Sequence, residues 1–100
     1  MITADFGIVP IGHNDINIRE YVTVAVESIK NSGLNYELTA MGTQLEAENL
    51  NDLYSAIADA QEAVFKKGVN RVYTVIKIDD RRDEKRSLTD KVKTVNDLMK

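Results

Sequence analysis

The sequence has no cysteine, no tryptophan, one proline and one histidine among its 100 residues. Without cysteine the chain cannot form disulfides, use a thiol nucleophile or hold a metal through thiolates, and it suits a reducing compartment. No apolar run approaches the roughly 20 residues that span a bilayer. The first residues lack the basic flank of a signal peptide and carry Asp5. These absences predict a soluble, cytoplasmic protein with no membrane partner.

Positive and negative charges are interleaved along the chain, with 13 basic and 16 acidic residues and a net charge of −3. This mixture provides no basic surface, so we expect no nucleic-acid partner. RNA binding on a sheet surface would also require aromatic side chains on the central strands, and residues 43–47 have none. With 43% hydrophobic residues, the composition predicts a single domain over residues 1–100 with a modest core.

Four segments alternate apolar and polar residues with the period of two that is typical of β-strands. The first covers residues 2–9. Residues 35–41 and 43–47 form a predicted hairpin around Gly42, which we expect to adopt positive φ in a tight turn. The fourth segment, residues 71–79, is apolar on both parities, so both faces of the sheet are expected to be partly covered there.

Three segments show the 3.6-residue apolar period of amphipathic helices. The first covers residues 18–31, the second closes at Gly68, and the third reaches Leu98 or Met99. Tyr21 and Tyr54 fall in apolar stripes, which predicts that both are core residues. Each helix is preceded by a side chain that can accept a hydrogen bond from a free N–H group of the first turn. These expected caps are Asn17 with Glu20, Asn49 with Asp52, and Ser87 with Asp90.

The order of elements is β-α-β-β-α-β followed by a last helix. Two helices crossing one face of a four-stranded antiparallel sheet make the ferredoxin-like arrangement, with the spatial strand order 4-1-3-2. The sequence therefore predicts an α+β fold, a ferredoxin-like βαββαβ sandwich with an additional C-terminal helix.

In this fold one face of the sheet is left open. Asp5, Glu46 and Lys77 are expected to lie close together on it, two carboxylates flanking one ammonium. This group is either an interfacial ion pair, the commoner case because buried charges must be paired, or a site where one carboxylate holds a cationic or amino-bearing ligand. The face mixes apolar and charged residues, so we expect another subunit to cover it. Its predicted members are Asp5, Gly7, Val9, Met41, Gln44, Glu46, Tyr73, Val75, Lys77 and Asp79.

Other charged and polar candidates have simpler interpretations. His13 lies alone in a polar loop, where a histidine is usually solvated. Residues 79–86 carry four acids and four bases, so they form either a solvated loop or, more specifically, a small-anion clamp made by Arg81 and Arg82. The chain has no catalytic triad, glycine-rich phosphate loop or metal-ligand spacing. We therefore expect no catalysis, no metal and no cofactor.

Four short motifs stand in order along nearly the whole chain. They are Val9-Pro10-Ile11-Gly12; residues 36–41 running into Gly42-Thr43-x-x-Glu46; Arg71-Val72 leading to Ile76-Lys77-Ile78-Asp79-x-Arg81; and Lys91-Val92-x-x-Val95. In this order and spacing they resemble the thiamine-binding protein family, the YkoF-like proteins of ferredoxin-like fold. The resemblance implies a non-catalytic protein that assembles as a homotetramer and binds thiamine or its hydroxymethylpyrimidine part.

The resemblance also marks positions for the ligand. A carboxylate such as Glu46 and a hydroxyl such as Thr43 suit the edge of an aminopyrimidine, which presents both donors and acceptors. Tyr73 and Met41 suit a thiazolium cation. Together with the open face, the resemblance gives eight candidate ligand-binding residues: Met41, Thr43, Glu46, Tyr73, Lys77, Asp79, Arg81 and Asp5.

Two functions of other classes stay open. The chain is alternatively a structural or regulatory homo-oligomer, in which the charged cluster only sets the register between subunits. An acylphosphatase-like enzyme on the same fold is the third hypothesis.

Overall fold

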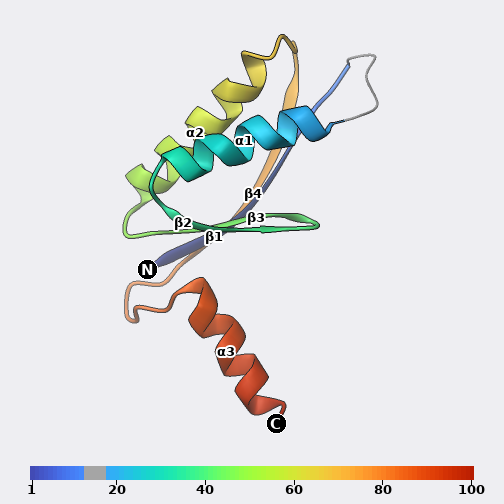
Figure 1. The fold of residues 1–100 in the computed structure, drawn as a ribbon. Helices are drawn as coiled ribbons and strands as arrows, with labels where there is room; N and C mark the ends of the chain where they lie inside the picture. The colour runs from blue at the N-terminus through green and yellow to red at the C-terminus, as the bar shows by residue number, and fades with distance from the viewer. Residues whose placement is uncertain (13–17) are drawn as a thin grey trace.

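Four antiparallel strands and three helices make up the part of the chain that the computed structural model describes, residues 1–12 and 18–100. The strands form one sheet in the order β2-β3-β1-β4, with α1 and α2 on one face (Figure 1). The predicted ferredoxin-like α+β fold and strand order are confirmed. The elements are β1 (Ile2–Pro10), α1 (Arg19–Asn31), β2 (Asn35–Thr39), β3 (Gly42–Ala47), α2 (Leu50–Phe65), β4 (Val72–Asp80) and α3 (Leu88–Leu98).

The core lies between the sheet and the helices α1 and α2. Strand β1 is central, pairing with β3 on one side and β4 on the other, so its helix-facing residues meet neighbours from both strands. Burial of such apolar side chains is the main force that holds the layers together. The largest fully buried side chains are Phe6, Ile29, Leu45, Leu53 and Val64.

The helix ends follow local signals in the sequence. The side chain of Asn49 accepts a hydrogen bond from Asp52 N at 2.9 Å and caps α2, as predicted. Gly33 stops α1 with a φ of +81°, a conformation that favours glycine because it has no Cβ. The predictions for His13 and for the Asn17 cap lie outside the described residues.

Two local predictions are wrong. Gly42 does not adopt positive φ, and the turn of the hairpin falls at Ala40 and Met41. Gly42 serves instead for close approach, because a Cβ there would lie 2.9 Å from Asp5 Oδ1 and 3.2 Å from the Phe6 carbonyl oxygen. Tyr54 is 50% exposed, not a core residue, because the buried stripe of α2 runs through its neighbours on the next face.

Helix α3 projects from one end of the sheet, away from α1 and α2 (Figure 1). None of its residues is buried, and the exposed fractions of Val92, Val95 and Leu98 are 58%, 55% and 81%. The radius of gyration, 14.8 Å, exceeds the value of about 13 Å expected for 100 residues. The apolar stripe of α3 therefore has no cover within the described chain.

The first turn of α3 is nevertheless anchored to the sheet. Leu88 N donates to Glu46 Oε2 at 2.8 Å. The Lys91 ammonium donates to Thr3 Oγ1 at 2.6 Å and to Asp79 Oδ2 at 2.7 Å. These contacts hold the helix at one end only. None of the helices in the described ranges combines the length and apolarity needed to cross a membrane.

Acidification is expected to loosen this first turn. Ser87 N donates to Asp90 Oδ2 at 3.1 Å within a capping box. This hydrogen bond holds the pKa of Asp90 below its usual 3.8, so the stabilisation is present above pH 3.8 and is lost as the pH falls through the lowered pKa. Amide chemical shifts of α3, followed by NMR during an acid titration, should report the loosening. Asp90→Asn should remove that transition, and an unchanged titration in this variant would contradict the assignment.

Candidate ligand-binding site

The open face of the sheet carries most of the residues predicted for it. Strand register places Asp5 of β1 between Gln44 of β3 and Lys77 of β4, so these three side chains share one face. Val75 and Tyr73 follow Lys77 along the same parity of β4 and are exposed. An apolar strip therefore continues from the polar group along the edge of the sheet.

A shallow hollow of about 210 Å³ opens on this face beside the base of α3. Asp5 Oδ1 accepts a hydrogen bond from Gln44 Nε2 at 2.6 Å, which fixes the carboxylate at the wall. Within the described residues, no hydrogen bond or ion pair engages the Lys77 ammonium. The hollow thus presents a donor and an acceptor that face solvent. Its lining residues are Thr3, Ala4, Asp5, Gln44, Lys77, Asp79 and Leu88.

Glu46 does not complete the predicted group of two carboxylates around one ammonium. It pairs in the sheet with Thr3, one step beyond Asp5. Its carboxylate accepts from Leu88 N at 2.8 Å and from Asn35 Nδ2 at 2.6 Å. The N-terminus of a helix favours a negative charge, which explains why the first turn of α3 packs against the Glu46 carboxylate. Glu46 therefore positions α3 at the rim of the hollow.

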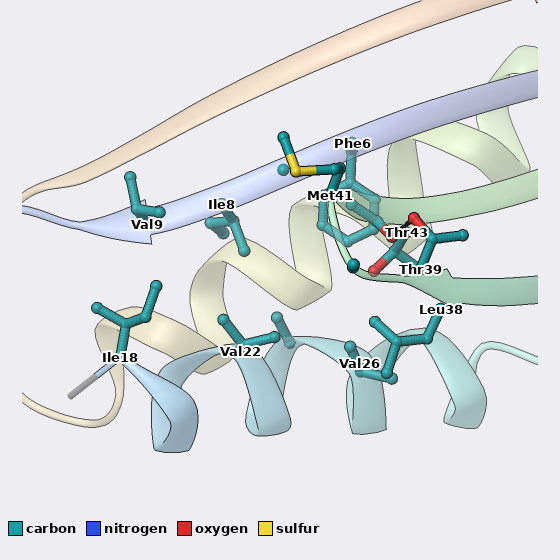
Figure 2. Close-up of a pocket in the computed structure, with 14 residues that line it drawn as sticks. Phe6, Ile8, Val9, Ile18, Val22, Val26, Leu38, Thr39, Met41 and Thr43 are labelled. Atoms are coloured by element: carbon teal, nitrogen blue, oxygen red, sulfur yellow. Dashed lines mark hydrogen bonds between the residues drawn. The ribbon is translucent and has the colours of Figure 1, made fainter.

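Thr43 lies on the other side of the sheet, whereas Met41 lies in the hairpin turn with its side chain 92% exposed. They line a cleft of about 200 Å³ between α1 and the β2–β3 hairpin. Figure 2 shows Val22 of α1 below Ile8 of β1, and Val26 of α1 beside Leu38 of the hairpin. Sequence patterns did not predict this cleft, because its walls have the periodicity of ordinary core residues. The family positions on the hairpin and on β4 are thus divided between two faces.

Arg81 and Arg82 are engaged by neighbouring acids. Arg81 Nε lies 2.9 Å from Asp83 Oδ1, and Arg82 Nη2 lies 2.8 Å from Asp80 Oδ2. The hydrogen bond from Arg82 lowers the pKa of Asp80, and the one from Arg81 lowers the pKa of Asp83. Both guanidinium groups are neutralised within the loop, so this geometry agrees with a solvated loop better than with an anion clamp.

The arrangement of the side chains offers no metal site among the described residues. Among residues 1–12 and 18–100, no cluster of three or more histidine or acidic side chains has the geometry to hold a metal ion. The polar groups of the hollow are suited to binding a molecule by hydrogen bonds and charge.

Comparison with known proteins connects these surfaces to a family. The family model described as "Thiamine-binding protein" matches residues 4–96. A UPF0045 protein of Methanothermobacter thermautotrophicus is 47% identical over 97 residues, which cover 97% of this chain and 98% of that protein. The UPF0045 protein YqgV of Bacillus subtilis is 42% identical over 100 residues, covering 96% of this chain and 95% of that protein.

Solved structures agree with the fold. Protein MJ1052 of Methanocaldococcus jannaschii superposes with a TM-score of 0.85 at 33% identity, covering 95% of both chains. A protein of Thermotoga maritima with a suggested role in thiamine biosynthesis or salvage has a TM-score of 0.78 at 20% identity, covering 94% of this chain and 97% of that chain. At that identity the likeness shows the fold alone. Because the family model spans nearly the whole chain, the protein belongs to the thiamine-binding protein family.

Proposed function

We propose that this protein is a non-catalytic small-molecule-binding protein that holds thiamine or its hydroxymethylpyrimidine part in the hollow on the open sheet face, at an interface between subunits. The observation that carries the proposal is that Asp5 and Lys77 lie opposite each other on adjacent strands. Among the described residues, no group engages the Lys77 ammonium. Membership of a family described as thiamine-binding supports the choice of ligand.

The chemistry of the hollow suits an aminopyrimidine. The amino group of the pyrimidine would donate a hydrogen bond to the Asp5 carboxylate, and a ring nitrogen would accept one from the Lys77 ammonium. Asp79 adds a second carboxylate at the rim, although Lys91 already pairs with it. In intact thiamine, the cationic thiazolium ring would extend along β4 toward Tyr73, whose exposed ring favours a cation.

A second copy of the chain is proposed to cover the open face. Val75 and Tyr73 on the sheet and Val92 and Val95 on α3 are exposed apolar residues. An isolated helix of 11 residues is marginally stable in water, so α3 requires packing against another surface. A homo-oligomer such as the predicted tetramer would bury both the open sheet face and the apolar stripe of α3, and would close the hollow. The cytoplasmic location predicted from the sequence stays a prediction.

Isothermal titration calorimetry tests this proposal with Asp5→Asn. The substitution keeps the acceptor for Gln44 but removes the charge, so affinity for thiamine and for hydroxymethylpyrimidine should fall by about tenfold or more. Asp59→Asn is the matched control, because Asp59 is exposed on α2, which covers the other face of the sheet. Its affinity should equal that of the unchanged protein.

Two outcomes would count against the thiamine site. No binding heat with either compound at millimolar concentration removes the ligand from the proposal. If the protein is nevertheless a stable oligomer, that result favours the structural or regulatory oligomer instead. Equal affinities for the Asp5 and Asp59 variants would place the ligand elsewhere on the protein.

A further inference from the structure

We infer that Lys91 of α3 sets the charge preference of the hollow on the open sheet face, biasing it toward uncharged ligands and against cations. The inference rests on the proposed function, because it concerns the ligand of that same hollow. Lys91 begins the motif Lys91-Val92-x-x-Val95, which the proposed contacts to the ligand do not use. Its side chain nevertheless reaches two residues that line the hollow, Thr3 and Asp79.

The Lys91 ammonium is held in a defined position. It donates to Thr3 Oγ1 at 2.6 Å and to Asp79 Oδ2 at 2.7 Å. Thr3 is only 6% exposed, so its hydroxyl is a fixed acceptor and not a mobile surface group. The bond from Leu88 N to Glu46 places the first turn of α3 at the rim, and residues three apart on a helix share one face. Lys91 is therefore held beside the wall of the hollow.

This lysine balances the charge of the hollow. The lining contains two carboxylates, Asp5 and Asp79, and one ammonium, Lys77, which leaves one negative charge in excess. The ion pair between Lys91 and Asp79 cancels that excess. The Glu46 carboxylate at the rim is offset by the positive end of the α3 dipole. A cationic ligand therefore meets no surplus of negative charge, whereas a neutral ligand needs none.

The exposure of the ion pair sets the size of the effect. The exposed fractions of the Lys91 and Asp79 side chains are 36% and 64%. One unit charge at about 10 Å changes the affinity for an ion by roughly two- to fifteenfold, for effective dielectric constants between about 80 and about 20. Salt screens such charges over a Debye length of about 10 Å at about 0.1 M. We therefore expect a moderate selectivity that weakens as salt is added.

The test compares two ligands, the cation thiamine and the neutral hydroxymethylpyrimidine, by isothermal titration calorimetry of the full chain at low salt and slightly alkaline pH. Lys91→Met leaves Asp79 unpaired, so the ratio of the two affinities should move toward thiamine by roughly two- to fifteenfold. Asp79→Asn leaves Lys91 unpaired, so the ratio should move toward hydroxymethylpyrimidine by a similar factor. The double variant restores the charge balance and should return the ratio to that of the unchanged protein.

The opposite directions separate a charge effect from a structural one. Both single substitutions break the same ion pair, so loosening of α3 alone would move the ratio in the same direction or not at all. Lys93→Met is the matched control, because this exposed lysine of α3 pairs with Asp97 at 3.1 Å, and it should leave the ratio unchanged. Shifts in one direction only, no shift, or shifts that added salt does not weaken would overturn the inference.

Failure of this inference differs from failure of the proposed function. If neither compound gives binding heat with any variant, the thiamine site is removed, and the role of Lys91 is overturned with it. If the unchanged protein binds both compounds and the single variants keep its ratio of affinities, the site stands and the role of Lys91 alone is overturned.

Discussion

Phe6→Ala is expected to lower the free energy of unfolding by about 3–5 kcal/mol, a large part of the roughly 5–15 kcal/mol of a typical domain. Phe6 is 2% exposed and lies on the central strand β1, opposite Thr43 of β3 and Ile76 of β4. Its removal leaves a cavity where the sheet meets the helices. Surrounding side chains cannot fill that cavity, because both neighbouring strands are fixed by their own hydrogen bonds.

Urea unfolding followed by circular dichroism measures this loss. Phe65→Ala provides the matched control, because Phe65 ends α2 and is only partly buried against the core. It should lose clearly less stability than Phe6→Ala. Equal losses would mean that the contacts of the central strand are not the main support of the sheet.

Replacing Val92 and Val95 together with glutamate is expected to convert the proposed oligomer into a monomer. Both residues lie on the apolar stripe of α3, which no other part of the described chain covers. Two carboxylates buried in a subunit interface without partners would cost more than the packing of a short helix supplies. The capping box at Ser87 would remain, but α3 should lose most of its helical structure beyond the first turn.

Light scattering after size-exclusion chromatography should report the change in mass, and hydrogen exchange should report faster exchange in α3. The control replaces Lys93 and Thr94 with glutamate, since these exposed residues lie on the other side of the same helix. The control should stay associated. A monomeric unchanged protein, or an oligomer that survives the Val92 and Val95 changes, would contradict a role for α3 in assembly.

Features that depend on near neighbours in the chain were predictable. The alternation of β1 and the cap residues Asn49 and Ser87 act within a few positions, and the structure has them as expected. Gly42 shows the limit of such reasoning. A glycine in a hairpin indicates positive φ by local rules, but its role here is to leave space for Asp5, a residue 37 positions earlier in the printed sequence.

The candidate site was predictable only in part for the same reason. Parity and strand order brought Asp5 and Lys77 to one face, because both follow from pattern and topology. The role of Glu46 could be known only from the position of α3, because Leu88 N at the N-terminus of that helix donates to the Glu46 carboxylate. The cleft beside Thr43 depends on the separation between α1 and the hairpin, a distance that no period in the sequence encodes.

Strand β3 serves two surfaces through two consecutive residues, Thr43 toward the cleft and Gln44 toward the hollow. A slip of one residue in its pairing with β1 would exchange the two faces. The amide of Gln44 would then enter the apolar layer, and the Thr43 hydroxyl would reach solvent. Insertions or deletions that shift this pairing by an odd number of residues would therefore destroy both surfaces together, whereas a shift by two would keep the alternation intact.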